Sequence, residues 1–220
     1  MKSTASTIVF CLTIPFLFTT FACSKNNDDT GQPASVTEVE GIYFVTRYGY
    51  NGGTFSYFEP FVLFKDGSIR KNLQQPVETL DIAEDKTSNS SKWGFWKKDN
   101  GNVQIQWRNE NETWKNGEYY VSFPADNEEK LNGTYTSFFA LANSQRGQRY
   151  SFSANGSFSM SRQTGSGNQI LTGTYELKGF GIYFTYNNGS REAWSFCFYP
   201  KKGVKNPDAF LMAEDNFTKN

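Results

Sequence analysis

Short runs of alternating apolar and polar residues occupy most of the chain after residue 38, and turn signals separate these runs. In one run, Val103, Ile105 and Trp107 point to one face of an extended strand, and the polar residues between them point to the other. Asn-Gly and Asp-Gly pairs favour the type I′ turns that close β-hairpins. Such pairs begin at Asn51, Asp66, Asn100, Asn116, Asn132, Asn155 and Asn188. The pattern predicts an all-β protein built as an antiparallel meander.

A run near the C-terminus shows the same alternation. Across residues 194–199, one Trp and two Phe share a face, and Ser195, Cys197 and Tyr199 share the other. One apolar and one polar face are typical of an antiparallel sheet with one side in solvent. We therefore expect a sheet that is solvated on one side, although Cys197 by itself is typical of a small buried hydrophobic residue.

Two halves of the chain match each other in the same order, which predicts an internal duplication. The matched segments are 41–43 and 133–135, 61–69 and 150–158, 94–96 and 173–175, and 103–107 and 182–186. Glycines and turn residues stay in step throughout, and Trp114 falls opposite Trp194. We place the first repeat at about 41–130 and the second at about 133–217.

Each repeat holds five or six predicted strands, and an open meander of that size leaves two long edges that invite aggregation. Closure of the strands into a barrel removes such edges. The sequence therefore predicts either one barrel made of both repeats or two small half-barrels.

The order of these motifs resembles the lipocalin-like (calycin) domains of secreted bacterial and fungal proteins. The resemblance rests on Gly41-Ile42-Tyr43, the Asp66-Gly67 turn after an apolar strand, and a second Gly-x-Tyr at Gly173. It implies a lipocalin-like barrel over residues 38–220. Because the motifs consist of turn and core residues, the resemblance implies a fold and no particular activity.

The first 22 residues predict a signal peptide. Lys2 supplies the positive start, and the apolar run of residues 8–18 is too short to span a membrane as a helix. Thr20 and Ala22 place small residues at positions −3 and −1 of a cleavage site after Ala22.

The residue after that site, Cys23, resembles the acylated cysteine of bacterial lipoproteins. The resemblance implies that lipid chains on Cys23 anchor the protein to a membrane. Residues 23–37 are polar and predict a flexible tether. Lys25 followed by Asp28 and Asp29 resembles the surface-export signal of Bacteroidota lipoproteins. We therefore expect a cell-envelope protein, held at the outer membrane and exposed on the cell surface.

Composition excludes several classes of function. The chain has 220 residues with 22 basic and 22 acidic side chains, so no broad positive field attracts nucleic acid. It has no histidine, which removes Ser-His-Asp and Cys-His catalysis and histidine-ligated metals. With Cys11 in the signal peptide and Cys23 acylated, Cys197 has no partner for a disulfide. We expect no cofactor and no metal site, and the sequence leaves the oligomeric state open.

Three functions remain open, and the first is a barrel that binds a small or apolar ligand. Its candidate lining residues are Tyr57, Glu59, Trp96, Trp107, Tyr175, Tyr186 and Trp194. The alternative for these aromatic residues is that they fill the core. The second function is a glycan-binding or adhesive surface that uses Trp93, Phe95 and Tyr183 as exposed platforms.

The third function is a glycosidase-like enzyme that uses a pair of carboxylates. The available residues are Glu59, Glu78, Asp81, Glu176 and Glu192, and no motif pairs them. We therefore expect binding and no catalysis. The first repeat also carries an acidic insertion within residues 73–91, which we expect to be either a lid over a barrel mouth or a solvated loop.

The lipid anchor is testable by substitution of one residue. Without acyl chains the protein loses its hydrophobic anchor, so Cys23→Ser is expected to move it from the detergent phase to the aqueous phase. Phase partitioning of the expressed protein measures this. Partitioning of Cys23→Ser identical to that of the wild type would contradict the prediction.

Overall fold

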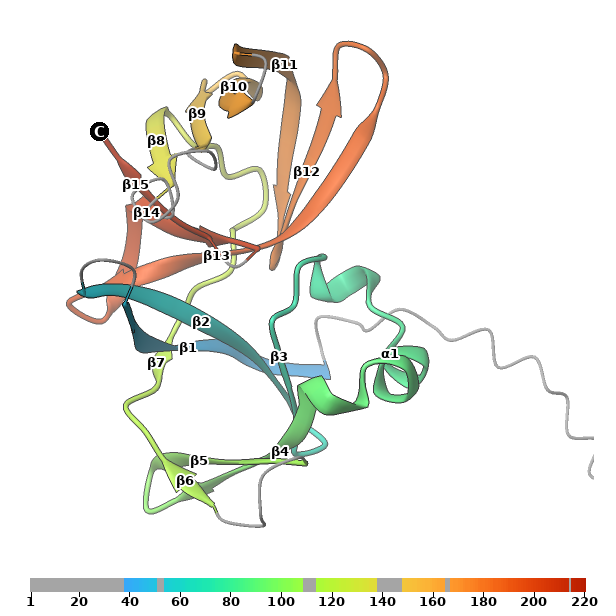
Figure 1. The fold of residues 1–220 in the computed structure, drawn as a ribbon, viewed down its shortest axis with the longest axis vertical. Helices are drawn as coiled ribbons and strands as arrows, with labels where there is room; N and C mark the ends of the chain where they lie inside the picture. Colours follow the sequence, from blue (N-terminus) through green and yellow to red (C-terminus); the bar gives the residue numbers. More distant parts are fainter. Residues whose placement is uncertain (1–37, 51–53, 109–113, 138–147, 165–166, 214) are drawn as a thin grey trace, which may run out of the picture. The chain divides into compact units, whose positions relative to one another are not determined.

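The computed structural model describes residues 38–220 except 51–53, 109–113, 138–147, 165–166 and 214. The predicted signal peptide, Cys23 and the tether of residues 23–37 lie outside this part. The described residues form one seven-stranded antiparallel sheet and one closed antiparallel barrel, which confirms the all-β class and the lipocalin-like barrel (Figure 1). In the described ranges, no helix has the length and apolar character needed to cross a membrane.

The first sheet curls into an incomplete barrel, which we call the cup. Its strands are β1 (Val39–Tyr50), β2 (Thr54–Phe64), β3 (Ser68–Lys71), β4 (Trp93–Asp99), β5 (Asn102–Trp107), β6 (Lys115–Asn116) and β7 (Tyr120–Val121). Their spatial order is β6-β5-β4-β3-β2-β1-β7.

The two edges of the cup are joined by a single short segment, residues 115–121, which we call the strap. Its first part, β6, pairs with β5, and its last part, β7, pairs with β1. From Asn116 to Tyr120 an extended chain reaches roughly 14 Å at most. The strap therefore holds β1 and β5, the strands next to its own two short strands, close together, and the sheet must curl to allow this.

The second half of the chain forms the closed barrel. Its strands are β8 (Gly133–Ser137), β9 (Gln148–Phe152), β10 (Ser157–Thr164), β11 (Gly167–Lys178), β12 (Gly181–Tyr186), β13 (Arg191–Lys201), β14 (Val204–Met212) and β15 (Asp215–Lys219). They close in the order β10-β11-β12-β13-β14-β15-β8-β9.

Both predicted arrangements of the repeats need correction. The repeats do not share one barrel, because the second half closes by itself. The alternative of two small half-barrels fits the cup, which is a curled half-barrel, but not the second half, which is a complete barrel. Three strands, β13, β14 and β15, connect β12 to β8 in the second half. In the first half, the two-residue strands β6 and β7 are all that lies between β5 and β1.

The matched residues of the two halves occupy strands of the same order and in the same register. Gly94 lies opposite Trp107 between β4 and β5, and Gly173 lies opposite Tyr186 between β11 and β12. A Cβ atom on either glycine would lie 2.4 Å or less from a backbone oxygen of the neighbouring strand, so both positions require glycine. Such shared constraints are what an internal duplication produces.

The turns before β3 and β10 also use the same chemistry. In residues 66–68 and 155–157, the side-chain oxygen of the first residue accepts hydrogen bonds from the backbone N–H and the hydroxyl of the serine. The glycines between them, Gly67 and Gly156, have φ of 82° and 84°, in the left-handed region that glycine adopts readily.

A third hydrophobic core lies between the cup and the barrel, and we call it the shared core. It joins Ile42, Phe44 and Val62 of the cup to Cys197 and Leu211 of the barrel. The expectation that the face carrying Ser195, Cys197 and Tyr199 is solvated is therefore wrong, because these residues are buried. Both faces of β13 are interior, one inside the barrel and one against the cup.

The insertion of residues 73–91 is part of this shared core. It contains the 3-10 helices η2 (Val77–Thr79) and η3 (Ser90–Lys92), with α1 (Ile82–Ser88) between them. Leu73, Val77 and Leu80 are buried in the shared core. The segment is therefore neither a lid nor a solvated loop, because its apolar residues have partners.

Backbone and carboxylate groups of the insertion also bind the barrel. Ser195 donates its hydroxyl to the carbonyl of Leu73, at 2.6 Å, and the Phe180 N–H donates to Oε1 of Glu78, at 2.8 Å. Burial raises the pKa of Glu78, against the opposing effect of this hydrogen bond. The predicted acidic loop thus supplies an acceptor at the contact between the two sheets.

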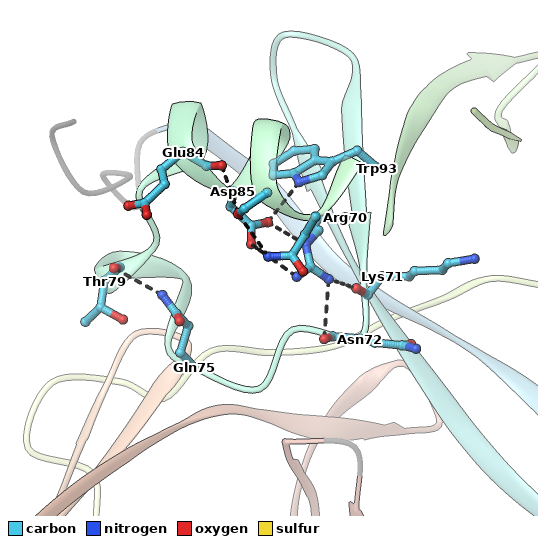
Figure 2. A network of polar contacts seen from close by, with 10 residues as sticks. Arg70, Lys71, Asn72, Gln75, Thr79, Glu84, Asp85 and Trp93 are labelled. Carbon is cyan, nitrogen blue, oxygen red and sulfur yellow. Dashed lines mark hydrogen bonds and ion pairs between the residues drawn. The ribbon is translucent and has the colours of Figure 1, made fainter. Parts of the chain in front are cut away.

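A buried ion pair holds α1 against β3 and β4 (Figure 2). Arg70 Nε lies 2.6 Å from Asp85 Oδ2, and the Trp93 indole N–H donates to the same oxygen at 2.8 Å. Arg70 also donates to the carbonyl oxygens of Lys71 and Asn72. Both charged side chains are largely shielded from solvent, since they are 5% and 12% exposed.

Loss of this carboxylate is expected to destabilise the fold strongly. Burial opposes ionisation of Asp85, but the hydrogen bonds and charge of Arg70, with the Trp93 N–H, hold its pKa below the usual value. Asp85→Asn leaves the Arg70 charge buried and unpaired, so we expect the free energy of unfolding at pH 7 to fall by about 3–5 kcal/mol. Urea denaturation measures this.

The pH dependence has a defined sign. Because the folded pKa is lowered, the contribution of Asp85 is present above its unfolded pKa of about 3.9 and is lost as the pH falls through the folded value. The difference between wild type and Asp85→Asn should therefore shrink below about pH 4. Asp208→Asn is the control, because its exposed pair with Lys219 should contribute less than about 1 kcal/mol. Equal losses in both variants would contradict the assignment.

Candidate functional site

A pocket lies at one end of the cup, between β1, the β4–β5 hairpin and the strap, and we refer to it as the cavity. It has a volume of about 410 Å³. This is within the range of small-molecule sites, roughly 300–1,000 Å³. Its lining residues are Tyr43, Lys98, Gly101, Asn102, Val103, Gly117, Glu118, Tyr119 and Tyr120.

Charged and hydrogen-bonding groups surround this cavity. Lys98 Nζ lies 2.9 Å from Glu40 Oε1, and this hydrogen bond, with the phenol of Tyr43, raises the pKa of Lys98. Tyr120 donates its hydroxyl to Oε2 of Glu118, at 3.1 Å. The cavity therefore presents a cation, a carboxylate and phenol groups to a bound molecule.

The floor of the cup is apolar and packed. Phe61, Ile105 and Trp107 are buried there, and the ring of Phe61 lies 5.5 Å from that of Trp107. Tyr119 of the strap packs edge-on against Phe61, with 6.0 Å between the ring centroids. Tyr119 therefore lines the polar cavity and also contacts the apolar floor of the cup.

Of the residues predicted to line a ligand site, four lie in the cup, and the three whose side chains the structure describes do not line the cavity. Trp107 is buried in the floor, and half-buried Trp96 donates its indole N–H to the carbonyl of Phe64, at 2.8 Å. Glu59 forms an ion pair with Arg47, at 2.7 Å. Tyr57 lies on β2 opposite Arg47, and its side chain is outside the described part of the structure.

The other three predicted residues belong to the barrel. Tyr175 donates its hydroxyl to the carbonyl of Leu131, at 2.9 Å, and Tyr186 donates to Oε2 of Glu192, at 2.8 Å. Burial raises the pKa of Tyr175 to about 12, so its phenol is uncharged at neutral pH. Trp194 is partly buried against the barrel core.

The interior of the barrel is occupied by its own aromatic rings. The centroids of Phe158 and Phe184 are 4.7 Å apart, and those of Phe152 and Tyr175 are 4.8 Å apart. These separations are typical of packed edge-to-face and tilted pairs. Tyr175 and Tyr186 therefore fill the core of the barrel, which was the alternative to lining a ligand site.

The three predicted surface platforms have different environments. Trp93 is completely buried because α1 covers it, so its assignment as an exposed platform is wrong. Phe95 is 44% exposed, as a platform requires. Tyr183 is partly buried, and burial raises its pKa to about 12.

The carboxylates considered for catalysis have structural roles in four of five cases. Glu78 accepts a hydrogen bond from the barrel, and Asp81 caps α1 by accepting from the Glu84 N–H, at 3.0 Å. Glu59 and Glu192 are engaged by Arg47 and Tyr186, and Glu176 is exposed on β11. Among the described residues, no group of three His, Cys, Asp or Glu is arranged to hold a metal ion.

Sequence reasoning missed the residues that line the cavity. It selected aromatic residues on alternating strand positions, whereas Asn102 lies beside a turn and Tyr119 lies in a strap without alternation. The available signal was the pair Tyr119-Tyr120, which follows the Asn116-Gly117 turn signal after one residue, Glu118. Comparisons with known proteins found no matching family model, no matching curated protein and no matching solved structure.

The packed state of the barrel is testable by truncation of a central ring. Phe184→Ala should lower the free energy of unfolding by about 3–5 kcal/mol, because it opens a cavity in a filled core. Ile170→Ala, at an exposed position on β11, should change it by about 0.5 kcal/mol or less. Urea denaturation distinguishes the two. Tolerance of Phe184→Ala would indicate a barrel interior with room for a ligand.

Proposed function

We propose that the protein is a lipid-anchored binding protein of the bacterial cell envelope, and that it holds a small polar ligand of saccharide size in the cup. The observation that carries this proposal is the 410 Å³ cavity at the end of the cup. The packed rings of the closed barrel support the choice of the cup over the barrel as the ligand site.

The chemistry of the cavity fits a sugar ring. Pyranose rings have apolar C–H faces that pack on aromatic rings, and the cavity offers Tyr43 and Tyr119. The ring of Tyr120 instead stacks on Phe44, outside the cup interior. Sugar hydroxyls both donate and accept hydrogen bonds, and Asn102 and Glu118 supply the complementary groups. Tyrosine combines a rigid contact surface with a polar end, so it suits a site that is half apolar and half wet.

The N-terminal sequence supports a location at the outer membrane. The predicted signal peptide and Cys23 provide export and a lipid anchor, and the polar tether of residues 23–37 separates the folded part from the bilayer. The resemblance to Bacteroidota surface lipoproteins favours exposure on the cell surface. A binding protein in this place meets external saccharides before they enter the cell.

The proposal is tested by titration of the purified chain with neutral saccharides. Glucose, galactose, N-acetylglucosamine and their β-linked disaccharides form the panel, and saturation-transfer NMR followed by calorimetry detects binding. Asn102→Ala and Tyr43→Phe should each weaken binding about fivefold, the effect of one lost hydrogen bond.

A matched control keeps the test specific to the cup. Asn168→Ala removes an exposed amide from β11 of the barrel and should leave the affinity unchanged. Absence of binding across the panel would reject a saccharide site. Binding that survives both cup variants would move the site elsewhere in the protein.

A further inference from the structure

The outer face of the cup carries exposed aromatic and cationic side chains together. Strand alternation turns Trp96 toward the cup interior, so Phe95 and Lys97 point outward. We call the four residues Phe95, Lys97, Arg108 and Trp114 the outer patch. It lies on the opposite side of the sheet from the cavity and does not depend on the proposed function.

The outer patch consists of two pairs, each with a cation over a ring. Arg108 Cζ lies 5.5 Å from the ring centroid of Phe95, and Lys97 Nζ lies 4.3 Å from that of Trp114. Both distances are within the range of cation–π attraction. The rings remain accessible, since Phe95 is 44% exposed and Trp114 is 37% exposed.

The two cations are not neutralised by carboxylates of the described residues. Neither Lys97 nor Arg108 forms an ion pair there. Asp66 binds Lys86, at 3.0 Å. Asp99, two positions after Lys97 on β4, accepts a hydrogen bond from the neutral Gln104 amide, at 3.3 Å, and keeps its own charge. The four residues of the outer patch carry two positive charges, and Asp99 is the one acidic residue of the same strand.

We propose that the outer patch binds an anionic polysaccharide. Sugar rings pack on Phe95 and Trp114, and carboxylate or sulfate groups of the same chain pair with Arg108 and Lys97. Phe95 and Lys97 are two positions apart on one strand, about 7 Å along it. Two ring–cation pairs side by side on a sheet surface match a linear ligand in which ring and charge repeat.

Polar groups between the pairs favour a carbohydrate over a lipid surface. Gln106 lies opposite Phe95 in register, and Gln104 lies opposite Lys97. The half-buried amide of Gln106 can exchange hydrogen bonds with hydroxyl groups, whereas an acyl-chain region offers no such partners. The Gln104 amide is engaged within the sheet, because its N–H donates to Asp99 and its Oε1 is buried.

The experiment measures binding of polymers to the mature chain, kept soluble by Cys23→Ser. Chondroitin sulfate and polygalacturonate are the anionic probes, dextran is the neutral probe, and phosphatidylglycerol vesicles represent an anionic membrane. We expect both anionic polymers to bind at 50 mM salt and to bind at least fivefold more weakly at 200 mM, because binding releases counterions. Dextran and vesicles should bind at least tenfold more weakly than the polymers.

Variants separate the contributions of charge and ring. The double variant Lys97→Gln with Arg108→Gln should lose at least tenfold in affinity and most of the salt dependence. Trp114→Ala should lose at least threefold and keep the salt dependence, and Trp114→Tyr should restore part of the loss. The controls Lys201→Gln and Ile170→Ala, exposed on the barrel, should leave binding unchanged.

Several results would overturn the proposal. These are absent binding of both polyanions, equal binding of dextran, preferential binding of the vesicles, and an unchanged affinity in the double variant. Asn102→Ala in the cup should not change polymer binding, so failure of the outer patch and failure of the cup site are distinguishable. Thermal unfolding of each variant checks that the fold is retained.

Discussion

The burial of both faces of β1, β2 and β13 is the constraint on which the rest of the structure depends. One face of β2 carries Phe61 into the cup, and the other carries Val62 into the core shared with the barrel. On β13, Phe196 likewise points into the barrel interior, and Cys197 points into the core shared with the cup. Apolar burial is the main favourable term in folding, so these strands tie the cup interior, the barrel interior and the shared core into one folded unit.

The difference between the two halves follows from this constraint and from the strands available to each. The second half has β13, β14 and β15 to complete a ring of strands, and its interior fills with aromatic side chains. The first half has the short strap in that place, so its interior is filled at one end and hollow at the other. Similar strand patterns thus give a solid core in the second half of the chain and a cavity in the first.

The sequence predicted the fold class well and the candidate site poorly, for physical reasons. Strand alternation and turn pairs are local, so the positions of Gly94 and Trp107 in a hairpin followed directly from the pattern. Burial of Cys197 depends on a surface more than 100 residues away in the chain, which alternation cannot reveal. The same holds for Trp93, whose exposure on a polar face was expected until α1 was found to cover it. Asn102 and Tyr119 line the cavity because of the path that the strap takes, and the strap sequence has no alternation of apolar and polar residues that would predict this path.

The strap has a consequence for how the cup behaves over time. Each of its two strands is two residues long, so each holds its neighbour by a very short ladder. Short ladders at exposed edges open locally at a small fraction of the global unfolding free energy, whereas strands inside a closed ring open only with the whole domain. Amide protons of the strap and of the barrel should therefore belong to different exchange classes. Because the strap lines the cavity, local opening of these two short ladders would change the width of the cavity mouth while the barrel stays closed.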